Sequence, residues 1–411
     1  MSANQHHPHA AAPLARREAS ASPLRFWATA YTLCVLLVGT NIPTPLYHAY
    51  AMRFGFTPLV LTLIFSVYVG TLIPTLILGG SLSDAWGRRR VIVPAIVLAA
   101  AGTLGFCLAA NVAWLFAARA LQGLALGAAS GPLTAALSET EPRGRRHRAA
   151  LVSTLSSLGG LAIGPLLSGL IAQYTTHRFV LPYLIEIGLL LVALIAMSRY
   201  PDQNAHSAWK PRRPSVPSHM RAAFIVAGSA NFLAFAVIGL FLALVPSYTM
   251  TLAHTSNLAI AGASATLMLG CSMAAQVGAS SWESTTAQLS GAVLLPIGML
   301  ALAAAGERSS LGLLLCASVF AGLGHGLIFL GGLSQVNRLA PTGRHADVIS
   351  TFYILVYAGV GLPVIGIGLI ASHLGILAAM RIFVAVMIPL CIAEVALIAF
   401  KRRRPSPRRD V

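Results

Sequence analysis

Charged residues are scarce in this chain of 411 residues, because Asp, Glu, Lys and Arg together make up only 9% of it. Soluble domains contain about 25% of these residues. Hydrophobic residues account for 56% of the chain, and the mean hydropathy is +0.77. A soluble protein could not bury so much apolar surface, so the composition excludes a soluble globular protein and predicts a fold that is solvated by lipid.

Motifs for disulfide, metal and nucleotide chemistry are missing as well. The five cysteines are odd in number, fall within apolar runs and have no CxxC spacing, so we expect neither a disulfide framework nor a metal site. The P-loop pattern GxxxxGK[ST] does not occur, which argues against direct use of ATP. We therefore expect no cofactor.

Twelve apolar runs are the dominant feature that is present. At 1.5 Å per residue, a helix of about 20 residues crosses the hydrocarbon core of a bilayer. The sequence therefore predicts an all-α polytopic membrane protein with twelve transmembrane helices. The runs lie near residues 25–47, 58–80, 91–110, 113–138, 149–173, 179–198, 221–248, 258–280, 289–305, 310–336, 346–372 and 375–400.

The net charge of +17 is distributed unevenly along the chain. If the N-terminus is cytoplasmic, 23 of the 28 Lys and Arg fall in cytoplasmic tails and loops, and only Arg53, Arg178 and Arg308 fall in outer loops. Cytoplasmic loops of membrane proteins carry such an excess of Lys and Arg. The bias predicts a multi-pass protein of the cell (inner) membrane with both termini in the cytoplasm. Nucleic acid is not needed to explain the charge.

A polar, basic and proline-rich linker divides the runs into six and six. The two halves match in one register at an offset of 199: PxGR occurs at 142–145 and 341–344, and GLIA at 169–172 and 368–371. Because six is an even number, both halves start on the same side, so the repeat is parallel about an axis along the membrane normal. The predicted domains are a cytoplasmic tail (1–24), a six-helix bundle (25–198), the linker (199–220), a second bundle (221–400) and a basic cytoplasmic tail (401–411).

Three motifs of the first half resemble those of a known family. The loop after the second run reads GGSLSDAWGRR, which is similar to the signature GxLxDxxGRR of the major facilitator superfamily. ARALQGLALGAA in the fourth run resembles RxxQGxxxA, and GLAIGPLLSG in the fifth resembles the antiporter signature GxxxGPxxGG, with Ser168 replacing one glycine. Within the superfamily the chain resembles the twelve-span drug:proton antiporters. The resemblance implies a secondary transporter, not an enzyme, that exports small organic molecules or drugs by alternating access in exchange for protons.

The resemblance also implies the partners: the lipid bilayer, a small-molecule substrate and protons, with the proton gradient as the energy source. We expect the chain to act as a monomer. A sugar or metabolite carrier of the same fold is the alternative assignment. A membrane enzyme or receptor would need a catalytic constellation or an appended domain, and no loop outside the linker is long enough for one.

The loop between the second and third runs carries four charges in a chain with few. Gly79 and Gly80 are expected to permit a sharp exit from the second helix. The resemblance implies a conformational latch, with Asp84 facing the N-terminal end of the eleventh run; a plainer interpretation is that Asp84 caps the third helix and the arginines orient the chain. The loop aligned with it in the second half keeps an acid, Glu283, but no arginine, which favours an asymmetric latch. The latch residues are Gly80, Asp84, Gly87, Arg88 and Arg89.

The fifth run combines small residues with a proline. Small faces let helices approach closely, and proline permits bending, so the motif serves close packing, re-packing during transport, or both. Its residues are Gly160, Gly164, Pro165 and Gly169.

Ionisable side chains inside the runs are few, and each costs about 2.5–3.5 kcal/mol at a helix centre by insertion scales. Arg119 matches the fourth-run signature, and we expect it to hold a substrate anion or to change the pKa of a nearby carboxyl during proton release. The plainer alternative is a fixed pair that keeps the helix in register. The first run, where several related exporters carry an acid, has Asn41 instead. Glu186 and Glu394 are the remaining deep carboxyls, although both lie on runs that this fold places at the periphery; His325 can titrate near pH 7. The proton-coupling candidates are therefore Arg119, Glu186, Glu394 and His325.

The predicted substrate cavity is mostly uncharged, with aromatic and amide side chains from the first, fourth, seventh and tenth runs, which line the central cavity in this superfamily. Such a lining suits amphipathic or weakly anionic organic molecules. The candidate residues are Asn41, Arg119, Gln122, Asn231, Phe235 and His325.

Overall fold

The computed structural model describes residues 22–201, 214–341 and 344–403 of the chain. Within these ranges every regular element is a helix, and twelve segments are long and apolar enough to cross a membrane. The predicted all-α fold with twelve membrane-spanning helices is therefore confirmed.

Each half of the chain supplies six of the spans. The N-terminal half consists of α2 (Pro23–Asn41), the 3-10 turn η1 (Thr44–Leu46), α3 (Tyr47–Phe54), α4 (Pro58–Trp86), α5 (Arg88–Cys107), α6 (Val112–Thr140), α7 (Arg146–Tyr174) and α8 (Leu181–Ser198). The C-terminal half consists of the 3-10 turn η2 (Ser218–Met220), α9 (Arg221–Ala243), α10 (Val245–Leu252), α11 (Leu258–Gly278), α12 (Ser284–Glu307), α13 (Leu311–Leu339), α14 (His345–Leu374) and α15 (Ile376–Arg403).

The first span of each half is interrupted by proline. α2 ends at Asn41, and Pro43 and Pro45 follow before the chain continues through η1 into α3. Proline has no amide hydrogen to donate and clashes with a preceding helical turn. In the C-terminal half, Pro246 stands in the first turn of α10, directly after α9. The sequence predicted single runs at both places, and the structure shows a long helix followed by a short one.

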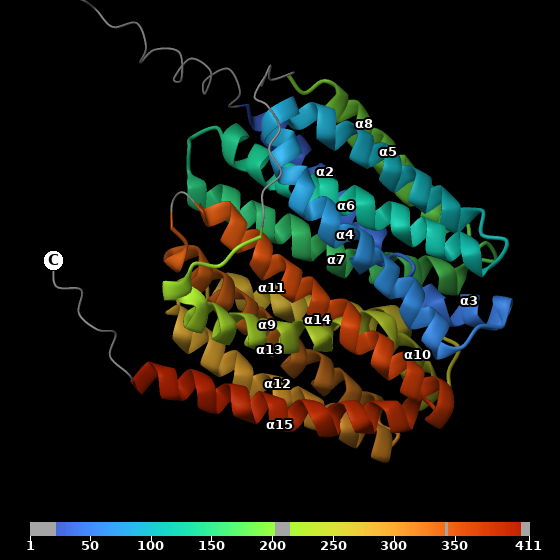
Figure 1. Cartoon of the computed structure of the whole chain (residues 1–411). Coiled ribbons are helices and arrows are strands. Elements are labelled where there is room, and N and C mark those ends of the chain that lie inside the picture. Colours follow the sequence, from blue (N-terminus) through green and yellow to red (C-terminus); the bar gives the residue numbers. More distant parts are fainter. Residues whose placement is uncertain (1–21, 202–213, 342–343, 404–411) are drawn as a thin grey trace, which may run out of the picture.

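The helices run side by side, and the two halves lie against each other (Figure 1). We call the end where α2 begins and α15 ends the terminal end, and the opposite end, where α3 meets α4, the distal end. Asn111 and Asn257 cap the distal starts of α6 and α11 through side-chain oxygens that accept backbone amides at 2.9 to 3.4 Å. Such caps satisfy amides that have no partner within the helix.

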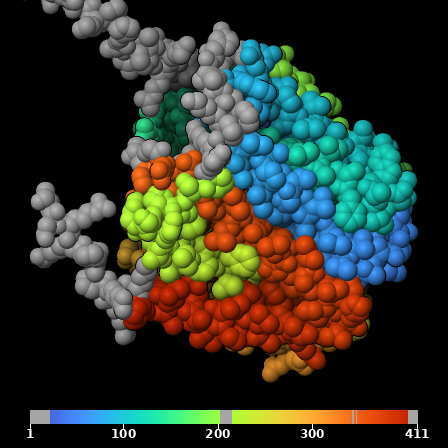
Figure 2. Space-filling model, viewed as in Figure 1, coloured from blue at the N-terminus to red at the C-terminus, as the bar shows by residue number. Residues whose placement is uncertain are grey.

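The halves meet along two helix pairs, α4 with α14 and α7 with α11. Figure 2 shows the surfaces of α4 (blue) and α14 (orange) in contact along one of these pairs. In the described part of the chain four hydrogen bonds link the halves, and all lie in the distal parts of their helices. They run from Leu59 N to Ser372 Oγ (2.8 Å), from Ser66 Oγ to Gly361 O (3.2 Å), from Leu258 N to Gln173 Oε1 (2.9 Å) and from Thr266 Oγ1 to Ala162 O (2.9 Å). We call this contact the distal seam.

Candidate functional site

Arg119 lies in the interior of the N-terminal half, with a relative exposure of 1%. Its Nε donates to the Tyr47 hydroxyl, and its Nη1 donates to the Thr40 carbonyl at 2.6 Å and to Gln122 Oε1 at 3.0 Å. The proline break after α2 brings both Thr40 and Tyr47 to the arginine. The end of the helix leaves the Thr40 carbonyl without an intrahelical partner, so this carbonyl can accept from Arg119. Nη2 has no hydrogen-bond partner.

Aromatic rings surround the Arg119 guanidinium. Cζ lies 5.3 to 5.8 Å from the centroids of four rings, which belong to Tyr47, Phe65, Tyr68 and Phe106. Cations over ring faces are attracted by the ring quadrupole, more strongly when water is excluded. The positive charge is thus held by rings and neutral oxygens, and no carboxylate is among its hydrogen-bond partners.

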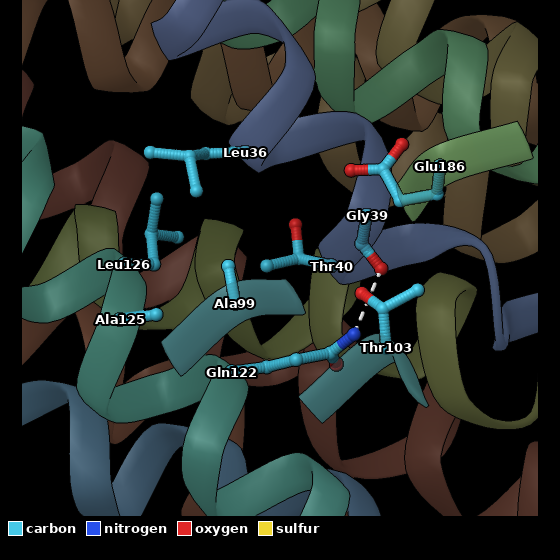
Figure 3. A pocket seen from close by; sticks show the side chains of 9 residues that line it. All are labelled: Leu36, Gly39, Thr40, Ala99, Thr103, Gln122, Ala125, Leu126 and Glu186. Carbon is cyan, nitrogen blue, oxygen red and sulfur yellow. Dashed lines mark hydrogen bonds between the residues drawn. The ribbon is translucent and has the colours of Figure 1, made fainter. Parts of the chain in front are cut away.

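A small cavity lies beside this arginine, with room for about one water molecule. Gln122 connects the two, since its Oε1 accepts from Arg119 and its Nε2 donates to the Gly39 carbonyl at 3.1 Å (Figure 3). Helices α2, α5, α6 and α8 supply the wall. The lining residues are Leu36, Gly39, Thr40, Ala99, Thr103, Gln122, Ala125, Leu126 and Glu186.

Glu186 of α8 is the only ionisable group in that wall. Its relative exposure is 0%, and neither carboxyl oxygen has a hydrogen-bond partner. The carboxyl lies against the backbone of α2: a Cβ built on Gly39 would be 2.6 Å from Glu186 Oε1 (Figure 3). Tyr31 and Cys34 of α2 are the other titratable groups near it. The structure therefore places Glu186 inside its bundle, although it belongs to a peripheral helix.

A second polar cluster lies in the C-terminal half. His325 Nδ1 is 2.8 Å from Ser272 Oγ, while Nε2 is buried without a partner. The His325 ring packs edge-on against Phe235 at 4.6 Å and lies parallel to Phe329 at 6.3 Å. Of the predicted cavity residues, the structure thus brings Phe235 together with His325, as it brings Arg119 together with Gln122.

The two predicted cavity asparagines are buried and bonded to backbone. Asn41 donates to the Leu161 carbonyl of α7 at 3.0 Å. Asn231 donates to the Ala227 carbonyl of its own helix at 2.7 Å and to the Ile328 carbonyl of α13 at 3.4 Å. In this conformation each asparagine joins neighbouring helices of one half.

The charged loop after α4 forms an ionic cluster at the terminal end. Arg88 Nη1 lies 2.7 Å from Asp84 Oδ1, and Arg88 Nη2 lies 2.9 Å from Glu139 Oε1 on α6. The N-cap of α5 is Gly87 with no side-chain cap, so the interpretation of Asp84 as a cap of the third helix is wrong. Gly87 has φ +98°, a conformation that favours glycine at this position of the motif.

The expected sharp exit at Gly79 and Gly80 is also wrong, because α4 continues as a helix to Trp86. A Cβ on Gly79 would lie 2.8 Å from the carbonyl oxygen of Ala128. This glycine therefore permits close packing of α4 on α6.

The next terminal-end loop, between α6 and α7, is organised by Glu141. Its Oε2 accepts the amides of Arg143 (2.9 Å) and Arg145 (2.6 Å), and its Oε1 lies 3.2 Å from Arg148 Nη1. Desolvation opposes ionisation of this carboxyl, but the two amides and Arg148 outweigh it and hold the pKa of Glu141 below its usual range.

The antiporter motif of α7 contacts both halves. Gly160 and Gly164 pack on α2, where added Cβ atoms would collide with the carbonyls of Cys34 and Val38. The Pro165 carbonyl, directly after Gly164, lies against Gly262, and Gly169 lies against Leu258, both on α11. The motif therefore lies between the α2 wall of the Glu186 cavity and the distal seam. Ser168 donates to the Gly164 carbonyl of its own helix at 2.9 Å, so this departure from the signature is accommodated locally.

Several residues around Arg119 were not predicted. Gly39, Thr40, Tyr68 and Phe106 come from three different helices, and no spacing in the sequence relates them. Tyr47 carried a weak signal, because at an offset of 201 it aligns with Tyr248, another buried tyrosine that follows a proline break. In the described residues no group of three or more His, Cys, Asp and Glu is arranged to hold a metal ion.

Two parallel six-helix halves with buried ionisable groups inside them define the class: a membrane transporter with an internal repeat. A model of the Major Facilitator Superfamily matches residues 29–363. The chain belongs to this superfamily, and it is a transporter rather than an enzyme.

Individual proteins and solved structures to which the chain is similar are consistent with this assignment. The chain is 30% identical over 183 residues to the putative multidrug resistance protein MdtD of Escherichia fergusonii; the match covers 44% of this chain and only 38% of that protein. The fold is similar to a peptide transporter POT in complex with sulfate (TM-score 0.78, 15% identity, 94% of this chain and 98% of that chain). It is also similar to a bacterial homolog of the human lysosomal transporter Spinster in an inward-facing, occupied conformation (TM-score 0.74, 16% identity, 94% and 100%).

Proposed function

We propose that this transporter exports small organic molecules in exchange for protons, and that Glu186 carries the proton. The observation that carries the proposal is the Glu186 carboxyl, which is fully buried with both oxygens unpaired. An isolated carboxylate is so costly to bury that such a group takes up a proton instead. The similarity to a putative multidrug resistance protein and the antiporter motif of α7 support export of drug-like molecules.

Loss of the proton would leave a carboxylate that requires a counter-charge. Arg119 can supply it, because its Nη2 is unpaired and Gln122 connects it to the wall of the same cavity. We propose that the guanidinium turns toward Glu186 and that its Nη1 bond to the Thr40 carbonyl of α2 is exchanged in this movement. The protonation state would then decide how α2 is held against α6.

The motif of α7 transmits such a change to the interface between the halves. α7 packs on α2 through Gly160 and Gly164 and on α11 through Pro165 and Gly169. A shift of α2 therefore changes the packing of α7 on α11 at the distal seam, since packed interfaces switch between discrete arrangements more readily than they deform. Alternating access follows if the seam opens when Glu186 and Arg119 pair.

The orientation follows from the excess of basic residues at the terminal end. We propose that both termini are cytoplasmic in the inner membrane and that the protein acts as a monomer. The closed distal seam then corresponds to an inward-facing state. In the outward-facing state we expect Asp84 to contact the N-terminal end of α14. The ionic cluster around Arg88 is then the arrangement of the latch in the inward-facing state.

The substrate cavity is proposed at the interface, with Phe235 and His325 as its aromatic wall and Asn41, Gln122 and Asn231 becoming accessible as the halves move. This lining favours amphipathic molecules. Arg119, whose Nη2 has no partner and can also donate to an anionic group of the substrate, connects substrate and proton.

The test is transport in an efflux-deficient bacterial host and in everted vesicles. A panel of drugs, dyes such as ethidium, and metabolites identifies substrates, and an uncoupler should abolish their uptake into the vesicles. Glu186→Gln and Arg119→Ala should lose export at normal membrane abundance, whereas Glu307→Gln, on an exposed carboxyl paired with Arg381, should retain it. Full export by Glu186→Gln, or uptake that is indifferent to the uncoupler, refutes the proposal; saturable transport of one metabolite without drug export identifies the alternative carrier.

A further inference from the structure

A second small cavity lies in the C-terminal half, again with room for about one water molecule. Its wall is apolar except at Glu394 and Cys391, which lie one turn apart on α15. The lining residues are Ala230, Leu233, Ala292, Leu295, Ile328, Cys391 and Glu394.

The two cavities occupy equivalent places in the repeat. α2, α5, α6 and α8, which surround the first cavity, are the first, third, fourth and sixth spans of their half. α9, α12, α13 and α15, which surround the second, are the first, third, fourth and sixth spans of theirs. In both cases the sixth span supplies the carboxyl, although at the offset of 199 Glu186 does not align with Glu394.

Glu394 faces its bundle and not the lipid. Its relative exposure is 7%, and it shares the buried stripe of α15 with Cys391 and Ile398. Ser229 Oγ on α9 donates to Glu394 Oε1 at 3.2 Å, in competition with the Ile225 carbonyl of its own helix at 2.8 Å. The side chains that α12 and α13 add to the wall are aliphatic, so the Cys391 thiol is the only other titratable group lining this cavity.

The carboxyls differ in depth and in what can neutralise them. Glu186 is five residues from the distal start of α8, whereas Glu394 is nine residues from the terminal end of α15. The position that aligns with Arg119 in the second half is Ser318, which bonds to its own helix at Leu314 O (3.0 Å). No arginine is therefore available where the first half has one.

We propose that Glu394 is a second proton-binding site, so that each half of the transporter binds one proton. This inference rests on the proposed proton coupling and deepens it, since it assigns a site to the second half. A single hydroxyl donor and an apolar wall favour the neutral acid there, because an ionised carboxyl would lack a counter-charge. Being nearer the terminal end, Glu394 is placed to exchange its proton with the opposite side of the membrane from Glu186.

The test counts protonated carboxyls without any substrate. Purified protein in lipid nanodiscs is titrated around neutral pH in H₂O and D₂O, and the carboxylic-acid C=O stretch is followed by infrared spectroscopy. The wild type should show two exchangeable acids; Glu394→Gln and Glu186→Gln should each remove roughly half of the absorbance, and the double variant all of it, because one of two neutral acids is lost each time. Glu307→Gln should change nothing.

The outcomes separate this inference from the proposed function. An unchanged acid band in Glu394→Gln would show that Glu394 is ionised and would overturn the second site, whatever the vesicle assays give. Uncoupler-insensitive transport would refute the proposed coupling while leaving the two bands in place. If Glu394→Gln does not fold, Ser229→Ala decides: it should shift the frequency of one acid band by removing its donor, and an unshifted spectrum refutes the site.

Discussion

Glu186→Met should make the protein more stable while it abolishes the proposed proton-coupled export. Both carboxyl oxygens of Glu186 are buried without partners. A buried polar group that lacks its hydrogen bond costs about 1–3 kcal/mol, and methionine has a similar length, no polar oxygen and a flexible chain. The adjoining cavity gives the larger sulfur room to settle. We therefore expect the free energy of unfolding to rise by about 2 kcal/mol.

The assay is reversible unfolding in mixed detergent micelles, followed by circular dichroism and by tryptophan fluorescence. Glu307→Met is the matched control, because this carboxyl is 58% exposed in its pair with Arg381 and its loss should change stability by less than about 1 kcal/mol. Export is measured in parallel with the substrate found in the panel. Destabilisation by Glu186→Met would mean that the carboxyl is hydrogen-bonded or paired in the native protein, and the reasoning from its isolation would then fail.

Three further predictions concern the two ends of the molecule. Arg88→Ala should lower the free energy of unfolding by about 1–2 kcal/mol, because it removes two ion pairs of one largely buried guanidinium. Arg381→Ala in an exposed pair should cost less than about 1 kcal/mol, and chemical unfolding compares the two variants. Gly262→Val should force the distal seam apart, since the new side chain meets a carbonyl of α7, and an impermeant maleimide should then label a distal cysteine more strongly. Gly270→Val places its side chain in open space and should be labelled like the parent. Glu141→Gln should destabilise the protein at neutral pH and lose that effect in acid, because the lowered pKa of Glu141 gives stability that is present above about pH 4.3 and disappears as the pH falls through the folded-state pKa. The melting temperatures of the variant and the parent should therefore converge across this range, and a constant difference would contradict the cause given.

The twelve spans were predictable because their lengths and hydropathy are set by the bilayer, whatever the helices pack against. The exact ends were less so. α4 runs on through Asp84 to Trp86, since the helix can continue into the polar interface once its carboxylate pairs with Arg88. The break after Asn41 depends on two prolines, and it creates the free carbonyl that Arg119 uses.

The surroundings of Arg119 show where prediction from the sequence ends. Its identity and its neighbour Gln122 follow from one helix and one motif. Its partners come from α2, α3, α4 and α5, and those on α2, α3 and α4 lie 50 to 80 positions away along the chain, such as Thr40. No periodicity encodes contacts between different helices, so the ring of aromatic side chains appears only in the structure.

Glu186 and Glu394 show a second limit of prediction from the sequence, which concerns the buried face of a membrane helix. In a soluble helix the apolar stripe marks the buried face, but a membrane helix is apolar towards lipid and towards its neighbours alike, so hydropathy does not distinguish the two faces of α8 or α15. The acids themselves do: a carboxyl cannot be left in lipid, so each marks the face that turns inward, and Tyr183, Leu190, Ala193 and Met197 follow the same buried stripe on α8. A peripheral helix therefore has an interior side, and an acid on it is evidence of a site within the bundle.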